Sequence, residues 1–156
     1  MKRYVFGQPI ETDAVKSKPK QSIWEDGILV KDGNTFTYRL HENEPVYGLG
    51  ESVRGINKRG WHYISDCTDD PNHTENKTSL YGAHNFIVFG ADKDKRYGIF
   101  VDTPGKVLTD IGYSVTDEMR IETDSDDYEI YLLEGASYLD VIREFRELIG
   151  QSYVAP

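Results

Sequence analysis

The fold is decided by the run Asn85-Phe86-Ile87-Val88-Phe89-Gly90, in which four apolar residues follow one another. Successive side chains point to opposite faces of a strand, so a strand formed by this run is apolar on both faces. Such strands are typical of the buried interior of a layered β structure. A second apolar run at residues 96–102 predicts the hairpin partner of this strand, across a polar turn at residues 91–95.

Shorter strands surround this hairpin. Residues 35–40 alternate aromatic or aliphatic side chains with polar ones, which is the period of a strand with one buried face. Further strands are predicted at residues 106–111, 119–123 and 128–133, separated by Asp, Gly and Ser residues that favour turns. Short strands at intervals of roughly ten residues are typical of an antiparallel sandwich or barrel. The chain is therefore predicted to be mainly β, folded as an antiparallel β-sandwich.

One helix is predicted at residues 138–149, where apolar residues recur on one stripe and charged residues occupy the other. Ser137 lies at the position of an N-cap, and Asp140 three residues later gives a variant of the capping box. Gly150 follows the last turn, where a residue with positive φ commonly ends a helix. The predicted fold is thus a β-sandwich with a single C-terminal α-helix.

The helix and the short tail after it determine the predicted domain organisation. Residues 1–150 suffice for one N-terminal domain with its own core, and residues 151–156 have the character of a linker. A sandwich followed by an amphipathic helix and a proline-containing tail is expected at the front of a longer chain. The alternative is a complete small domain whose helix covers its own sheet, and the residue pattern is compatible with both.

Charge and composition exclude several classes of partner. The formal net charge is −9 at pH 7, which repels the phosphates of nucleic acids and the head groups of anionic membranes. No segment approaches the length of a membrane span, and the basic start lacks the apolar run of a signal peptide. The single cysteine, Cys67, is typical of a reducing compartment. We therefore expect a cytoplasmic protein that binds neither nucleic acid nor membrane.

A glycine-rich stretch at residues 46–60 reads Val-Tyr-Gly-Leu-Gly-Glu-Ser-Val-Arg-Gly-Ile-Asn-Lys-Arg-Gly, with four glycines and four charged residues. Glycines at this density allow positive φ or a close approach of the backbone to another group. Arg54, Lys58 and Arg59 beside Glu51 suggest a loop held by charged hydrogen bonds at one edge of a site. The alternative is a long solvated turn.

A polar loop is predicted at residues 61–81, which contain three aspartates and two histidines but few core residues. Three interpretations are open. His and Asp side chains can ligate a metal, but their spacing matches no tight metal motif, and neither a metal nor another cofactor is expected. Carboxylates and aromatic rings can bind the hydroxyls and the apolar face of a sugar. Asp69-Asp70-Pro71 can also form a simple solvated turn.

Candidate catalytic groups are few. Asp69 and Asp70 are neighbours that point opposite ways in an extended segment, so they do not form the separated carboxylate pair of a glycosidase. A sugar mutarotase would instead use a histidine and a glutamate as acid and base. The candidates for that chemistry are Glu51, His41, His62, His73 and His84. Their spacing brings no two of them together, so no catalytic residue is predicted.

Five stretches carry a resemblance to a known family. They are Tyr47-Gly48-Leu49-Gly50-Glu51, Arg54-Gly55-Ile56-Asn57-Lys58-Arg59-Gly60, Leu80-Tyr81-Gly82-Ala83-His84-Asn85-Phe86, Gly98-Ile99-Phe100-Val101-Asp102 and Asp110-Ile111-Gly112-Tyr113. Together they resemble the N-terminal domain of family 31 glycoside hydrolases, the α-glucosidase family, and most closely that of bacterial enzymes from gut Firmicutes. The resemblance extends from about residue 46 to the end of the chain.

This resemblance implies a β-sandwich of the galactose-mutarotase-like kind in front of a (β/α)8 barrel. Members of the family hydrolyse terminal α-glucosidic bonds of oligosaccharides with retention, using an aspartate nucleophile and an aspartate acid/base that both lie in the barrel. Residues 1–156 stop before such a barrel, so the resemblance implies that they are catalytically silent on their own. The implied partners are the catalytic barrel of the same parent chain and an α-glucoside oligosaccharide.

The resemblance also implies a role for the polar loop. In the family, a loop of this domain places a carboxylate on sugar hydroxyls from a Thr-x-Asp or Asn-Thr-Asp element. The matching stretch is Cys67-Thr68-Asp69, so the substrate-binding role falls on Asp69, with Asp70 and then Asp66 as alternatives. Two other functions stay open, a stand-alone carbohydrate-binding sandwich and a free-standing mutarotase. A domain separated from its barrel exposes an apolar patch, which predicts self-association into a homo-oligomer.

Overall fold

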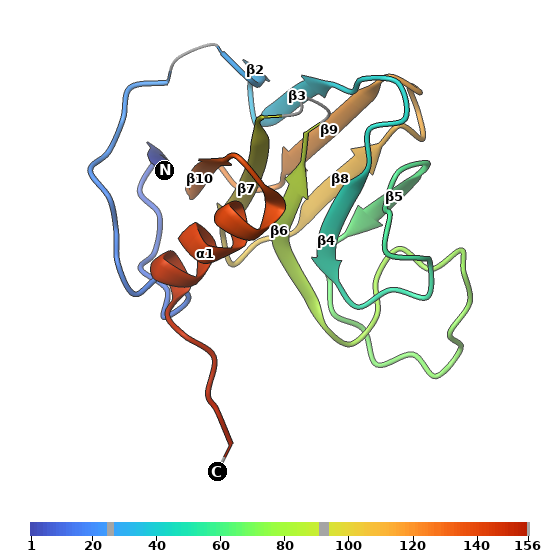
Figure 1. Ribbon diagram of the computed structural model, residues 1–156. Coiled ribbons are helices and arrows are strands. Elements are labelled where there is room, and N and C mark those ends of the chain that lie inside the picture. Colours follow the sequence, from blue (N-terminus) through green and yellow to red (C-terminus); the bar gives the residue numbers. More distant parts are fainter. Residues whose placement is uncertain (25–26, 91–93, 156) are drawn as a thin grey trace.

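The computed structural model describes residues 1–24, 27–90 and 94–155, which form two five-stranded antiparallel sheets and one helix (Figure 1). The first sheet has the order β1 (Lys2–Phe6), β10 (Tyr128–Gly135), β7 (Arg96–Asp102), β6 (Ala83–Phe89) and β4 (Val46–Gly50). The second has the order β2 (Val30–Asp32), β3 (Thr35–Arg39), β9 (Glu118–Thr123), β8 (Val107–Ile111) and β5 (Trp61–Ile64). The helix, α1, spans Tyr138–Ile149. The predicted β-sandwich with one C-terminal helix is confirmed.

The β6–β7 hairpin is buried on both of its faces. Ile87 and Phe89 belong to the core between the two sheets, whereas Phe86 and Val88 belong to a second cluster beneath α1. The prediction of a strand with two apolar faces is confirmed, and the helix explains why the outer face needs apolar residues. Of the turn predicted at residues 91–95, residues 91–93 lie outside the described part of the chain.

Helix α1 packs on the outer face of the first sheet, across β10, β7 and β6 (Figure 1). Val141 is fully buried, and a Cβ atom added to Gly98 of β7 would lie 2.6 Å from its Cγ1 atom. Gly98 therefore allows the helix to approach the sheet closely. Burial of this apolar stripe is what stabilises a helix of three turns, which would be marginal in isolation.

Both ends of α1 carry the predicted signals. The backbone N–H of Asp140 donates to Ser137 Oγ at 3.2 Å, and the backbone N–H of Ser137 donates to Asp140 Oδ2 at 3.0 Å. This is the reciprocal capping box expected from the sequence. Gly150 follows the helix with a φ of 91°, so the predicted positive φ is confirmed.

Within the described residues, no helix combines the length and hydrophobicity needed to cross a bilayer.

Strand β4 corrects the prediction that residues 46–60 are all loop. Gly48 has a φ of 123°, and a Cβ atom there would lie 2.2 Å from the carbonyl oxygen of Phe86 in β6. Gly50 has a φ of 77°, and its Cβ would lie 2.5 Å from the carbonyl oxygen of Gly82. The register of β4 against β6 shifts between these two glycines. They therefore serve an irregular edge strand, and the loop begins only after it.

Strand β5 corrects the prediction that residues 61–81 are all loop. Its four residues pair with β8, from Trp61 opposite Ile111 to Ile64 opposite Leu108. Tyr63 is 5% exposed and belongs to the core between the sheets. A strand of four residues is too short to show an alternating pattern, which is why the sequence did not reveal it.

Candidate functional site

Two loops at one end of the sandwich form the candidate site. The Gly-rich loop, residues 51–60, follows β4, and the site loop, residues 65–82, links β5 to β6. Strands β4 and β5 are edge strands of the two different sheets, so the loops span the open edge of the sandwich. The tail after α1 leaves the domain toward the same end (Figure 1). The two loops and the tail thus share one end of the molecule.

The Gly-rich loop is held in place by hydrogen bonds from its cationic side chains. Lys58 is 5% exposed, and its Nζ atom donates to Ser52 Oγ at 2.7 Å and to the Gly55 carbonyl oxygen at 3.2 Å. Burial lowers the pKa of this ammonium. The guanidinium of Arg59 donates to three backbone carbonyl oxygens outside the loop. The prediction of a loop held by charged hydrogen bonds is confirmed.

The base of the site loop is fixed to the sandwich. The backbone N–H of Ile64 donates to the Thr78 carbonyl oxygen at 3.0 Å, and that of Thr68 donates to the Leu80 carbonyl oxygen at 2.9 Å. The two ends of the loop therefore run side by side. Leu80 is 3% exposed and anchors the returning end of the loop. The tip, residues 69–77, extends beyond these contacts.

The three aspartates of the site loop have different environments. Asp66 forms an ion pair with Lys106, with 2.7 Å between Oδ2 and Nζ. Asp70 accepts a hydrogen bond from the Lys77 ammonium, which holds the pKa of Asp70 below its ordinary value. Asp69 is exposed, and its carboxylate forms no hydrogen bond or ion pair with any other described residue. Asp69 is therefore the aspartate whose oxygens remain available to a ligand.

Arg54 joins the Gly-rich loop to the tip. Its Nε atom donates to the Glu75 carbonyl oxygen at 2.8 Å, and its guanidinium carbon lies 3.9 Å from the centre of the Trp61 ring. Glu51 makes a second link between the loops, because its backbone N–H donates to the Gly82 carbonyl oxygen at 2.6 Å. Its carboxylate also accepts from the backbone N–H of Gly82 at 3.1 Å. The two loops therefore form one connected surface.

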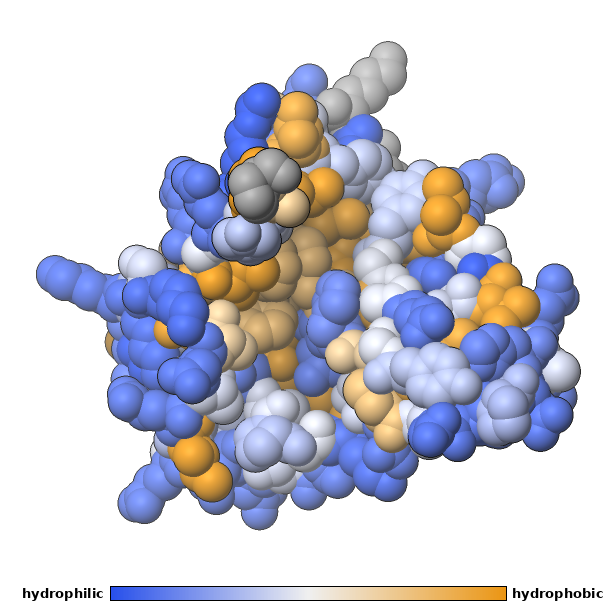
Figure 2. All heavy atoms as spheres, turned by 90° about the horizontal axis from the view of Figure 1, so that it is seen from below, coloured by the Kyte–Doolittle hydropathy of each residue, from blue (hydrophilic) through white to orange (hydrophobic). Residues whose placement is uncertain are grey.

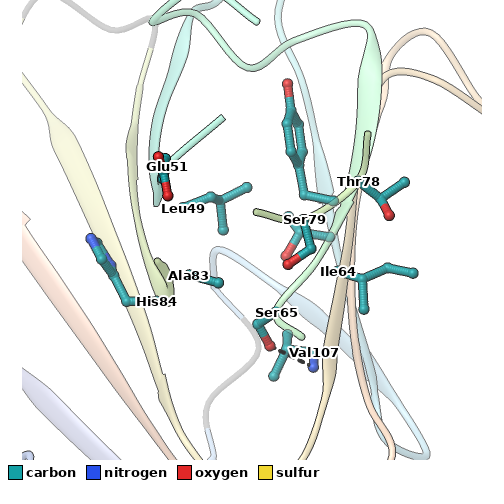
Figure 3. A pocket seen from close by; sticks show the side chains of 11 residues that line it. Leu49, Glu51, Ile64, Ser65, Thr78, Ser79, Ala83, His84 and Val107 are labelled. Carbon is teal, nitrogen blue, oxygen red and sulfur yellow. Dashed lines mark hydrogen bonds between the residues drawn. The ribbon is translucent and has the colours of Figure 1, made fainter. Parts of the chain in front are cut away.

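A small cavity of about 10 Å³ lies below the loops, between β4, β5 and β6. That volume holds about one water molecule, whereas pockets for small ligands are tens of times larger. The side chain of His84 points away from this cavity (Figure 3). This cavity is therefore too small to hold a sugar ring.

Of the candidate acid and base residues of a mutarotase, Glu51 and His84 line the same small cavity. Among the described residues, no hydrogen bond or ion pair joins Glu51 to any of the four histidines. His62 lies on β5 and His84 on β6, in different sheets, and His73 lies on the tip with its ring 5.2 Å from that of Tyr81. Within the described part of the chain, no cluster of three or more His, Cys, Asp or Glu side chains is arranged to hold a metal ion.

The sandwich and its loops match a known domain. Residues 6–110 match the family model described as the glycosyl hydrolase 31 N-terminal galactose mutarotase-like domain. This chain belongs to that family. The resemblance read from the sequence motifs is thereby confirmed, and the chain is referred to below as the GH31 N-terminal domain.

Curated relatives of this GH31 N-terminal domain are much longer proteins. An α-glucosidase of Saccharolobus solfataricus is 25% identical over 144 residues, which cover 90% of this chain and 21% of the relative. An α-xylosidase of Emericella nidulans is 26% identical over 140 residues, which cover 88% of this chain and 17% of the relative. The chain thus spans about a fifth of the length of these relatives.

Solved structures share the fold. The cycloalternan-degrading enzyme from Trueperella pyogenes, in complex with isomaltose, superposes with a TM-score of 0.74 at 19% identity over 85% of this chain and 21% of that one. The GH31 dextranase of Flavobacterium johnsoniae superposes with a TM-score of 0.70 at 25% identity over 85% of this chain and 16% of that one. The sandwich is therefore the fold that the family predicts.

Apolar side chains gather on the end of the GH31 N-terminal domain that carries the loops and the tail. Figure 2 looks at this end and shows a central apolar region bordered by polar side chains. Separately, the loops and the tail carry exposed large side chains: Val53 and Ile56 in the Gly-rich loop, Tyr81 in the site loop, and Tyr153 and Val154 in the tail. An apolar surface with a polar rim is typical of an interface with another protein or domain.

Proposed function

We propose that this GH31 N-terminal domain is the front part of a cytoplasmic α-glucosidase, which hydrolyses terminal α-linked glucose from oligosaccharides with retention. In this proposal, residues 151–156 link the sandwich to a (β/α)8 barrel that carries both catalytic aspartates. The domain alone has no hydrolytic activity. Its contribution is to pack against the barrel and to complete the substrate pocket with the site loop.

The observation that carries the proposal is the availability of Asp69. Asp66 and Asp70 are paired with lysines, whereas Asp69 is exposed on the tip without a partner among the described residues. A carboxylate accepts charge-assisted hydrogen bonds from adjacent sugar hydroxyls. Such a group contributes to binding only where its position is fixed relative to the reacting bond. A barrel docked beside the tip would provide that fixed position.

The arrangement of the tail supports this docking. The tail and the site loop lie at the same end of the domain (Figure 1), and the apolar region of Figure 2 lies between the elements of that end. A barrel that follows residue 156 would emerge at this end of the domain and could cover this region. Burial of exposed apolar area would stabilise the contact by roughly 25 cal/mol for each Å² removed from water.

Two substrate classes are suggested by the relatives, which include enzymes named α-glucosidase and enzymes named α-xylosidase. A xyloside lacks the hydroxymethyl group of a glucoside, so a barrel specific for one of them discriminates at that position. We propose the glucoside, because the motifs from residue 46 onward resemble those of bacterial α-glucosidases.

The test is to read the coding sequence past residue 156 and to assay the whole protein. A frame that continues into a barrel with two acidic strand-end residues, together with faster hydrolysis of p-nitrophenyl α-D-glucoside than of the α-D-xyloside, would support the proposal. Faster cleavage of the xyloside would move the protein to the α-xylosidases. A stop codon directly after residue 156 would contradict the proposal and favour a stand-alone carbohydrate-binding sandwich.

A further inference from the structure

We infer that Arg54 is a positioning residue for substrate binding, which fixes the tip and thereby orients the Asp69 carboxylate. The inference rests on the proposed function, in which Asp69 contacts the sugar. Arg54 does not reach the sugar itself in this account. It acts through the tip of the site loop, which it holds from the neighbouring Gly-rich loop.

The tip depends on Arg54 for its attachment. Backbone hydrogen bonds of the loop base end at Thr68 and Thr78, so residues 69–77 project beyond them. Within the described part of the chain, the bond from Arg54 Nε to the Glu75 carbonyl oxygen is the single hydrogen bond from the tip to another element. The His73 ring of the tip also lies 5.2 Å from the Tyr81 ring. Loss of the Arg54 bond would therefore leave the tip attached mainly through its base.

Arg54 is itself held in a defined geometry. Its guanidinium lies over the Trp61 ring, with 3.9 Å between the guanidinium carbon and the ring centre. The Trp61 ring is in turn supported by the Tyr113 ring, with 4.8 Å between centroids. The backbone of Arg54 is fixed by Ser52, whose Oγ donates to the Arg54 carbonyl oxygen at 3.3 Å and accepts from the buried Lys58 ammonium. Arg54 is thus a fixed support and not a freely moving surface side chain.

The position of Glu75 affects that of Asp69, because a contact within the tip connects the two sides of the loop. Glu75 lies two residues before Lys77, whose ammonium binds the carboxylate of Asp70. This contact joins the part of the tip that leads back towards β6 to the part that follows Thr68, next to Asp69. Fixing Glu75 therefore restricts the whole tip, including the backbone that carries Asp69. A carboxylate displaced by about 1 Å loses much of its contribution to the reaction.

A double-mutant cycle in the full-length protein tests the inference. The variants are Arg54→Ala, Asp69→Ala and the pair, with Arg120→Ala as the control for loss of an exposed arginine, one that forms an ion pair with Glu122 at 3.2 Å. Arg54→Ala is expected to lower kcat/KM for maltose about tenfold, whereas Arg120→Ala leaves it unchanged. In the Asp69→Ala background, Arg54→Ala is expected to change kcat/KM less than about twofold, because it acts through Asp69.

Two further readouts separate positioning from folding. Amide hydrogen exchange is expected to accelerate in residues 69–77 of Arg54→Ala and to stay unchanged in the core strands. Arg54→Lys keeps a donor for the Glu75 carbonyl oxygen and is expected to recover part of the lost kcat/KM. If Arg54→Ala does not fold, the same cycle with Arg54→Lys carries the test, with a smaller effect that again disappears without Asp69.

The outcomes are distinguishable from failure of the proposed function. If Asp69→Ala leaves kcat/KM unchanged, the substrate role of the site loop is wrong and the inference has no basis. If Asp69→Ala lowers kcat/KM but Arg54→Ala does not, the proposed function survives and the inference is overturned. An Arg54→Ala loss of the same size with and without Asp69 also overturns it, because Arg54 would then act elsewhere.

Discussion

The ring of Phe145 on α1 stacks on the ring of Phe86 on β6, with 3.7 Å between centroids and 4° between ring planes. Phe86 is 7% exposed and lies on the outer face of the hairpin from which the fold was predicted. The contact therefore joins the last element of the domain to its central sheet. It makes α1 part of the folded unit.

Replacement of Phe145 tests the contribution of this contact. Phe145→Ala is expected to lower the free energy of unfolding by about 2–4 kcal/mol, because it removes a stacked ring and leaves a cavity above Phe86. Leu139→Ala, at an exposed position of the same helix, is the control and is expected to change it by less than about 0.5 kcal/mol. Urea unfolding of both variants measures the difference, and equal values would show that the stacking is not stabilising.

Gly48 and Gly55 are predicted to differ in how much an added methyl group lowers the stability of the fold. Gly48→Ala places a Cβ atom 2.2 Å from the Phe86 carbonyl oxygen at a φ of 123°, so strand β4 must move away from β6. We expect a loss of about 2 kcal/mol or more in the free energy of unfolding. Gly55→Ala meets no atom within 4 Å and is expected to be nearly neutral. Thermal unfolding of the two variants checks this, and tolerance of Gly48→Ala would contradict the tight β4–β6 edge.

A buried carboxylate on β10 makes stability depend on pH. Burial of Glu129 opposes its ionisation, but hydrogen bonds from Arg3 and Tyr131 outweigh burial and lower its pKa to about 2. Asp102, opposite Glu129 on β7, has the reverse shift, because its own burial raises its pKa. The Lys18 ammonium lies 3.4 Å from Glu129 Oε1 and adds to the stabilisation of the ionised form.

The sign of the Glu129 effect follows from its lowered pKa. A carboxylate with a folded pKa below its unfolded value stabilises the fold above the unfolded pKa, and that stability is lost as the pH falls from about 4.5 to about 2. Glu129→Gln is expected to lower the free energy of unfolding at pH 7 by roughly 2–3 kcal/mol and to flatten its decline in acid. Glu134→Gln, at an exposed position of the same strand, is the control. A variant that keeps the acid dependence of the original chain would contradict this assignment.

The isolated domain is predicted to bind maltose too weakly to detect. Its cavity beneath the loops has a volume of about 10 Å³, and the exposed Asp69 lacks a second wall to complete a pocket. NMR titration of residues 1–156 with millimolar maltose is the measurement. Saturable shifts centred on the tip would favour the stand-alone carbohydrate-binding alternative. Sedimentation of the same sample tests the predicted self-association through the exposed apolar residues.

Much of the fold was predictable because its central elements have strong local patterns. The run at residues 86–89 is apolar at every position, and the apolar residues of α1 recur on one stripe, so both elements are evident in the sequence. Strands β1, β2 and β5 were missed because each is short. Strands β1 and β5 also owe their formation to pairing with a distant partner, β10 and β8 respectively. Strand β4 was not predicted because its glycines are typical of a loop. Their role, which is to allow a close approach to β6, is evident only from the folded structure.

The candidate site was predictable only in part. The sequence marked the Gly-rich loop by its charges and the site loop by its aspartates. The family resemblance ranked Asp69 before Asp70 and Asp66, but the residues themselves did not show which aspartate is unpaired, because the pairing of Asp66 with Lys106 and of Asp70 with Lys77 depends on the folded loop. The Arg54–Glu75 contact was likewise missed, since its partner is a backbone carbonyl that no residue type identifies.

The most direct test of the account is kcat/KM for maltose in the full-length protein with Asp69→Ala. Asp32→Ala is the matched control, because Asp32 is an exposed aspartate on β2, at the opposite end of the sandwich from the site loop (Figure 1). The account predicts a loss of about 5-fold to 150-fold for Asp69→Ala, the effect of roughly 1–3 kcal/mol of lost hydrogen bonding to a charged group, and no loss for Asp32→Ala. Equal kcat/KM values for Asp69→Ala and the unaltered protein would contradict it.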